Sequence, residues 1–149
     1  MLEDTLLTPM LESELVDNEL TGPQLFLNFI NQLEGWKTKC KNLHWAAPKY
    51  AIHMYLDAFL DIISDYQDGL AEGYMGILGK MQPNAIKGIT CDCLNALDFI
   101  DEVKMCALSF YDKIPQESIY VGIKSECEVF IHNINKYRYL FNLCDIRPY

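Results

Sequence analysis

The chain is poor in basic residues, and its first twenty positions contain none. Its 21 Asp and Glu residues outnumber its 12 Lys and Arg residues, which gives a formal net charge of −9. A nucleic-acid backbone repels a surface of this sign, so we expect no direct nucleic-acid binding. The one local basic cluster, Lys37, Lys39 and Lys41, is too small to reverse this expectation.

Long apolar runs are also missing, because charged residues interrupt every candidate membrane span. The first residues lack the basic start and apolar core of a signal peptide. We therefore expect no membrane partner, a cytoplasmic location, and six reduced cysteines that are mostly buried. Cys91 and Cys93 form a C-x-C pair, but no second pair of cysteines or histidines stands at zinc-ligand spacing, which disfavours a zinc site there.

Apolar residues recur at helical spacing along most of the chain, and no segment alternates with a period of two. We expect an acidic tail over residues 1–20 and one all-α four-helix bundle over residues 21–149. The first helix should begin around Pro23 and end near Trp45, and the others should span about 48–79, 91–112 and 116–144. A loop rich in Gly, Pro and Asn separates the middle two, and Leu94 and Leu97 are expected to face the core.

The second expected helix carries one histidine and five acids on one side. At about 100° per residue these six side chains fall within an arc of about 120°, and no Lys or Arg lies between the first and the last of them. Aligned carboxylates repel one another, and a bound cation would offset that repulsion. Imidazole and carboxylate ligands suit iron, manganese or zinc, although a plain solvated acidic face is the alternative. The six residues are His53, Asp57, Asp61, Asp65, Asp68 and Glu72.

His44 adds a second histidine near this face. It stands at the end of the first expected helix, one short turn before the second, so it can approach His53. Asp68 and Glu72 lie several turns farther along, so one chain does not easily bring all four residues together. A twofold-related copy whose second helix runs antiparallel can supply the two acids. We therefore expect a homodimer at least.

The spacing of these residues resembles the ferroxidase signature of the Dps-type mini-ferritins. That family carries a His-Trp pair at the end of its first helix, then H-x3-D and D-x3-E motifs on the second helix with ten residues between them. Here the matching residues are His44-Trp45, His53-x3-Asp57 and Asp68-x3-Glu72.

The resemblance implies a ferritin-like fold and a di-iron centre shared by two subunits. His44 and His53 would face the partner's Asp68 and the partner's Glu72, with Asp57 beside the histidines. The implied activity is oxidation of Fe²⁺ by peroxide or oxygen, with iron storage in a larger closed shell. Asp61 and Asp65 are additional acids that could replace Asp57 or feed iron to the centre.

The chain also departs from that family. The interval between Trp45 and His53 is shorter, which requires a tighter turn, and an acidic tail replaces the basic arm that some members use on DNA. The stretch HWAAPKYAIH also resembles phage-type proteins of unassigned function, which adds a host cytoplasm or a virion to the expected locations. The alternative function is a non-enzymatic ferritin-like structural or interaction protein. Glu128-x3-His132 has the wrong spacing for an intrachain ferritin site, so we expect neither residue to be a ligand.

Overall fold

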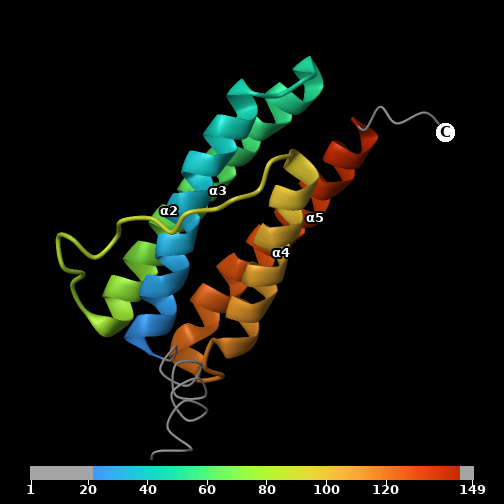
Figure 1. The fold of residues 1–149 in the computed structure, drawn as a ribbon. Coiled ribbons are helices and arrows are strands. Elements are labelled where there is room, and N and C mark those ends of the chain that lie inside the picture. Colours follow the sequence, from blue (N-terminus) through green and yellow to red (C-terminus); the bar gives the residue numbers. More distant parts are fainter. Residues whose placement is uncertain (1–21, 145–149) are drawn as a thin grey trace, which may run out of the picture.

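The computed structural model describes residues 22–144, and this part of the chain is helical without any strand (Figure 1). None of its helices is both long and apolar enough to cross a membrane. The expectation of an all-α chain is confirmed over this range, and the expected acidic tail lies outside it. The helices are α2 (Pro23–Trp45), α3 (Tyr50–Leu78), α4 (Ala96–Lys113) and α5 (Val121–Leu143), and the 3-10 turn η1 (Ser118–Tyr120) leads into the last of them.

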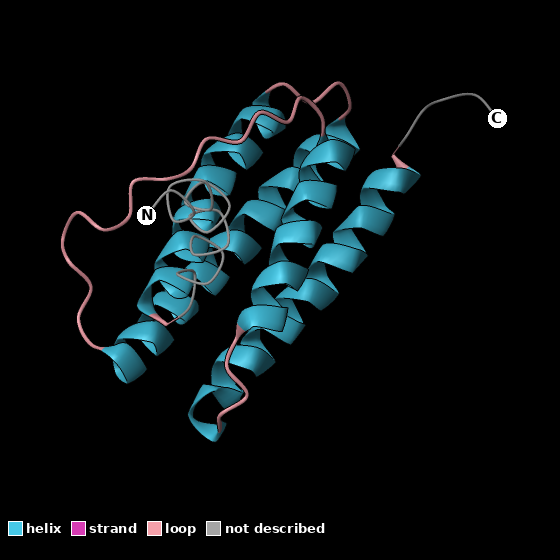
Figure 2. Ribbon diagram, turned by 60° about the horizontal axis from the view of Figure 1, so that its bottom comes forward, coloured by secondary structure: helices cyan, strands magenta, loops and turns pink. Residues whose placement is uncertain are grey.

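The four helices pack as two antiparallel hairpins side by side. A four-residue turn joins α2 to α3, and a short connection through η1 joins α4 to α5. Between the hairpins, residues 79–95 form a long crossover that runs along the outside of the bundle from the end of α3 to the start of α4 (Figures 1 and 2). Because the crossover spans the bundle, α3 and α4 point in the same direction. Contacts of α2 with α4 and of α3 with α5 close the bundle.

The core is built from the apolar stripes that the sequence predicts. Each helix turns one such stripe inward, as expected for amphipathic helices in a bundle. Aromatic rings fill much of the centre: Phe29 of α2 stacks on Phe110 of α4 with ring centroids 4.1 Å apart, and Tyr66 stacks on Phe130 at 4.2 Å. The largest fully buried side chains are Phe26, Phe29, Phe59, Phe99, Phe130, Phe141, Ile30, Leu33, Leu56, Ile63, Leu70 and Ile100.

Three helix starts differ from the expectation. Helix α3 begins at Tyr50 rather than at Pro48, and α5 is preceded by the separate turn η1 rather than starting at 116. The largest error is in α4, which begins at Ala96 and not at 91, because the Asn95 side chain accepts a hydrogen bond from the Asp98 backbone N–H at 2.8 Å and caps the helix there. Residues 91–94 therefore belong to the crossover, and Leu94 is 87% exposed instead of facing the core.

Helix α2 holds the crossover in place. The Asn31 side chain donates to the Ala85 carbonyl at 3.1 Å and accepts from the backbone N–H groups of Lys87 and Gly88 at 2.8 and 3.1 Å. One residue farther along, the Ile89 N–H donates to the Asn31 carbonyl at 3.0 Å. The backbone of the crossover comes so close to Gly35 of α2 that a Cβ atom added at Gly35 would lie 1.7 Å from the Ile89 carbonyl oxygen. The crossover is thus a docked segment whose course depends on two residues of α2.

Candidate metal centres

The two histidines of the expected site meet at the corner between α2 and α3. Their rings stack with centroids 3.6 Å apart and an interplanar angle of 20°. Nδ1 of His44 lies 2.6 Å from the His53 carbonyl oxygen, and Nδ1 of His53 lies 2.8 Å from the His44 carbonyl oxygen. The expected proximity of His44 and His53 is therefore confirmed, and the short turn is what brings them together.

These reciprocal hydrogen bonds fix the tautomer of both rings. A carbonyl oxygen can only accept, so each Nδ1 must carry the proton and donate. In a neutral imidazole the lone pair is then on Nε2, which is the atom left to bind a metal ion. A histidine ligand held at its other ring nitrogen by a backbone carbonyl is a common arrangement in metal sites, because the bond orients the ring. Both histidines are partly buried and have this arrangement.

The carboxylates of the expected site do not join the histidines within one chain. Asp57 lies one turn after His53 on α3. Asp68 lies fifteen residues after His53, or about 22 Å along the helix axis at 1.5 Å per residue. Asp68 and Glu72 are both exposed, as is Asp57. The chain alone thus provides two half-sites, a histidine pair at one end of α3 and an acid pair toward the other.

Exposed aromatic side chains border the histidine pair. Trp45 is 67% exposed with the ammonium of Lys41 5.7 Å from its ring centroid, and Tyr50 is 77% exposed. Tyr50 stacks on His53 with ring centroids 6.3 Å apart, and Met54 is also exposed. Large apolar side chains gathered beside a polar site are typical of surfaces that another protein covers.

A polar network joins α2 to α3 near the acid pair. Gln67 is buried, and its amide donates to the Glu34 carboxylate at 2.7 Å and to the Ile30 carbonyl at 3.3 Å. Its own oxygen accepts from the Lys37 ammonium at 2.9 Å. The hydrogen bond from Gln67 and the nearby Lys37 hold the pKa of Glu34 below its usual value, although partial burial opposes them. These groups and Asp68 line one shared hollow.

Replacing Gln67 by leucine is expected to lower the free energy of unfolding by about 1–2 kcal/mol at pH 7, because Glu34 and Lys37 lose their buried partner. The depressed pKa of Glu34 stabilises the native state above the ordinary pKa of a glutamate, and this stabilisation is lost as pH falls through the depressed value. In the Gln67→Leu variant that acid-dependent loss should shrink. Urea unfolding between neutral and acidic pH measures both effects. Gln24→Leu, at an exposed position, is the control. An equal loss of stability in this control would contradict the role of Gln67 as the partner of Glu34 and Lys37.

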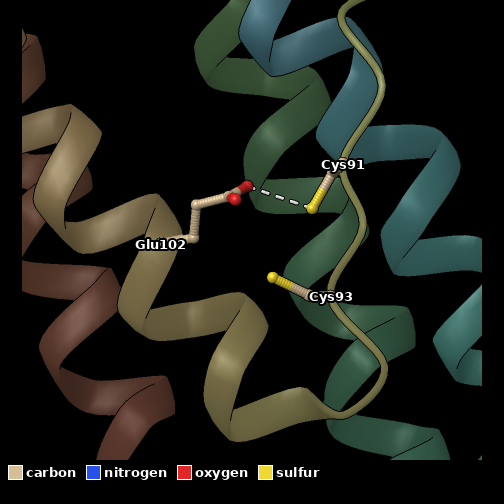
Figure 3. Close-up of side chains that lie close together, drawn as sticks. All are labelled: Cys91, Cys93 and Glu102. Carbon is tan, nitrogen blue, oxygen red and sulfur yellow. Dashed lines mark hydrogen bonds between the residues drawn. The ribbon is translucent and has the colours of Figure 1, made fainter.

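A third group of metal-ligating side chains lies where the crossover passes α4. Cys91, Cys93 and Glu102 place one ligand atom each within 4.8 Å of one another (Figure 3). The Cys91 thiol donates to Glu102 Oε2 at 3.0 Å, and the Trp36 indole donates to the same oxygen at 3.0 Å. Burial, with the hydrogen bond to Glu102 next in size, raises the pKa of Cys91 to about 12, and burial also raises the pKa of Cys93.

Sequence reasoning found the C-x-C pair but not its third member. Glu102 is nine residues after Cys93 and lies on a different element, so no local spacing connects them. Their contact depends on the course of the crossover along α2, which is a tertiary feature. All six cysteines are free thiols, in agreement with the expectation, and four of them are buried. Cys40 is one of these: burial and then the charge of Asp57 raise its pKa to about 12, and its thiol donates to the Leu56 carbonyl.

No family model, curated protein or solved structure matches the chain.

Proposed function

We propose that two copies of this chain bind and oxidise Fe²⁺ at sites formed between them, with His44 and His53 from one copy and Asp68 and Glu72 from the other. The observation that carries the proposal is the histidine pair, whose Nδ1 atoms are both engaged by backbone carbonyls and whose Nε2 atoms are left for a ligand. Zinc and manganese also suit such a set of nitrogen and oxygen ligands.

The topology supports a ferritin-like assignment of the bundle. Four-helix bundles with a single long crossover are characteristic of ferritin-like proteins, which build their metal sites from side chains on facing helices. Residues 79–95 are such a crossover, and α3 carries all the acids of the proposed site. The exposed Trp45 and Tyr50 beside the histidines supply apolar area for a partner to cover.

The acid face of α3 makes the proposed dimer dependent on cations. An antiparallel pairing that sets His53 opposite residues 68–72 of the partner also sets Asp57 opposite the partner's Asp65. It brings Asp61 near its own copy on the twofold axis. Like charges placed directly opposite one another are destabilising, and bound cations remove this repulsion. Fe²⁺ is therefore expected to favour the dimer as well as to be its substrate.

The proposed reaction needs only the residues of the site and an oxidant of the peroxide or dioxygen class. With peroxide, two Fe²⁺ ions each give one electron, the O–O bond breaks, and two protons complete two water molecules while the iron becomes Fe³⁺. The four side chains hold the two ions close together, so that both electrons reach one oxidant molecule. The remaining acids of α3 offer further oxygen ligands: Asp57, beside the histidines, to the Fe²⁺ ions, and Asp61 and Asp65 to the Fe³⁺ product.

Mixing two inactive variants tests whether the site is shared between copies. His44→Ala/His53→Ala and Asp68→Ala/Glu72→Ala should each be inactive alone. In a mixed dimer one site is intact and the other lacks all four ligands. Random assembly after co-expression makes half of the dimers mixed, so about a quarter of the wild-type oxidation rate should return.

Iron uptake and native mass measured on the same samples complete the test. Wild-type protein should bind about two iron ions per proposed site and should be dimeric or larger. No recovery of activity in the mixture would exclude a site shared between copies. A monomer that takes up no iron would favour the alternative function of a helical scaffold without chemistry.

A further inference from the structure

We propose that Cys91, Cys93 and Glu102 form a second, separate site that binds one thiophilic divalent cation of the Zn²⁺ class. The two thiols and the carboxylate approach one another from the crossover and from α4, as Figure 3 shows. Thiolate sulfur is the ligand that such cations prefer, and Zn²⁺ binds both cysteine sulfur and carboxylate oxygen in proteins. The proposed iron site offers only nitrogen and oxygen ligands, so the two sites should differ in the metal they select.

The hydrogen bonds around Glu102 resemble those that orient the ligands in metal sites of proteins. The Trp36 indole N–H, from α2, donates to Oε2 and fixes the carboxylate, whose two oxygens are the atoms that can bind a cation. Outer hydrogen bonds of this kind orient a metal ligand and contribute to affinity. On the crossover side, the Ile89 N–H bonded to Asn31 fixes the backbone two residues before Cys91. Both halves of the site are therefore positioned by the same stretch of α2.

The charge balance suits a divalent cation with one open position. On binding, Cys91 and Cys93 each release a proton to water, so that two thiolates and one carboxylate face the doubly charged ion. The hydrogen bond from the Cys91 thiol to Glu102 is replaced by bonds from both groups to the metal. Cys91 is buried, whereas Cys93 and Glu102 are partly exposed. Water can therefore take the fourth position of a tetrahedral site.

A bound cation would connect the crossover to α4. Leu94 alone separates Cys93 from the Asn95 cap, and it is exposed to solvent. A metal ion shared by Cys91, Cys93 and Glu102 ties this end of the crossover to the first turns of α4. Binding of a ligand to the native state alone raises the stability of the fold, so the cation should raise the melting temperature in a concentration-dependent manner.

Cadmium titration of the full-length protein, reduced and freed of metal by chelation, tests the site. Cd²⁺ should give one thiolate-to-metal charge-transfer band per chain, saturating at one equivalent. An excess of Zn²⁺ should compete with Cd²⁺ for the site and lower the intensity of this band. The Cys91→Ser and Cys93→Ser variants should each lose at least about 100-fold in affinity, and Trp36→Phe about tenfold, because it removes the bond that orients Glu102. Glu102→Gln keeps a partner for the indole and should also weaken binding by about tenfold or more.

Two sets of controls separate this site from the others. Cys106→Ser and Cys127→Ser remove thiols elsewhere and should leave the charge-transfer band unchanged. His44→Ala/His53→Ala should abolish iron oxidation without changing the band, so that failure of one site is distinguishable from failure of the other. Circular dichroism verifies that each variant is folded. The proposal is overturned if the Cys91→Ser/Cys93→Ser variant keeps the band, or if a Cys91–Cys93 disulfide that resists mild reductant forms instead of a metal complex.

Discussion

Replacing both Asp68 and Glu72 by alanine is expected to lower the rate of Fe²⁺ oxidation at least about 100-fold, to that of Fe²⁺ in buffer alone. The two carboxylates supply all the oxygen ligands that the partner contributes to the proposed site. The histidine pair and Asp57 that remain offer two Nε2 atoms and a single carboxylate, so the affinity for two cations at close range is lost. Stopped-flow absorbance of Fe³⁺ formation under peroxide or oxygen measures the rate.

This loss should not come from unfolding. Asp68 and Glu72 are exposed, so their truncation leaves the core unchanged. It also removes like-charge repulsion along α3, worth a few tenths of a kcal/mol per pair, so the variant should be as stable as the wild type or slightly more so. Glu128→Ala/His132→Ala is the matched control, since it removes an exposed acid and an exposed histidine from α5 and should leave the rate unchanged. Oxidation at the wild-type rate in the Asp68/Glu72 variant would show that the chemistry is elsewhere or absent.

The helices could be predicted from the sequence because their cause is local. The stripes that contain Phe26, Ile30 and Leu33 in α2 and Phe130, Ile134 and Phe141 in α5 repeat at the helical period, and all of them are buried. The start of α4 could not be predicted in this way. Residues 91–94 are apolar enough to continue the pattern, and the competing signal was the cap at Asn95, whose side chain bonds the backbone three residues on.

The same distinction between local and tertiary causes applies to the candidate sites. The proximity of His44 and His53 follows from their positions at the two ends of one short turn, so it could be predicted. Their reciprocal bonds to backbone carbonyls could not, because these depend on the conformation of the turn. The contact of Cys91 with Glu102 depends on a crossover that is directed by Asn31 and Gly35 in another helix. The spacing of residues in the sequence does not indicate this contact, because the contact depends on how the crossover packs against α2.

Gly35→Ala is expected to lower the free energy of unfolding by about 3 kcal/mol, although alanine in a helix interior normally stabilises by about 1 kcal/mol relative to glycine. The new Cβ would lie 1.7 Å from the Ile89 carbonyl oxygen, a separation that no rotation can relieve because both groups are backbone-fixed. The crossover must therefore move away from α2. The four bonds of Asn31 to Ala85, Lys87, Gly88 and Ile89 are then strained or lost, at about 1 kcal/mol each.

Gly76→Ala is expected to change the free energy of unfolding in the opposite direction and serves as the matched control. Gly76 lies in α3, and apart from the neighbouring backbone of its own helix no atom lies within 4 Å of an added Cβ, so alanine there should stabilise the fold by about 0.5–1 kcal/mol. Urea unfolding of the two variants should thus move the midpoint in opposite directions. Because Ile89 is two residues before Cys91, Gly35→Ala should also weaken Cd²⁺ binding at the crossover while Gly76→Ala leaves it unchanged. Equal stabilisation by both substitutions would mean that the crossover does not rest on α2, and the thiol pair would then have no fixed position opposite Glu102.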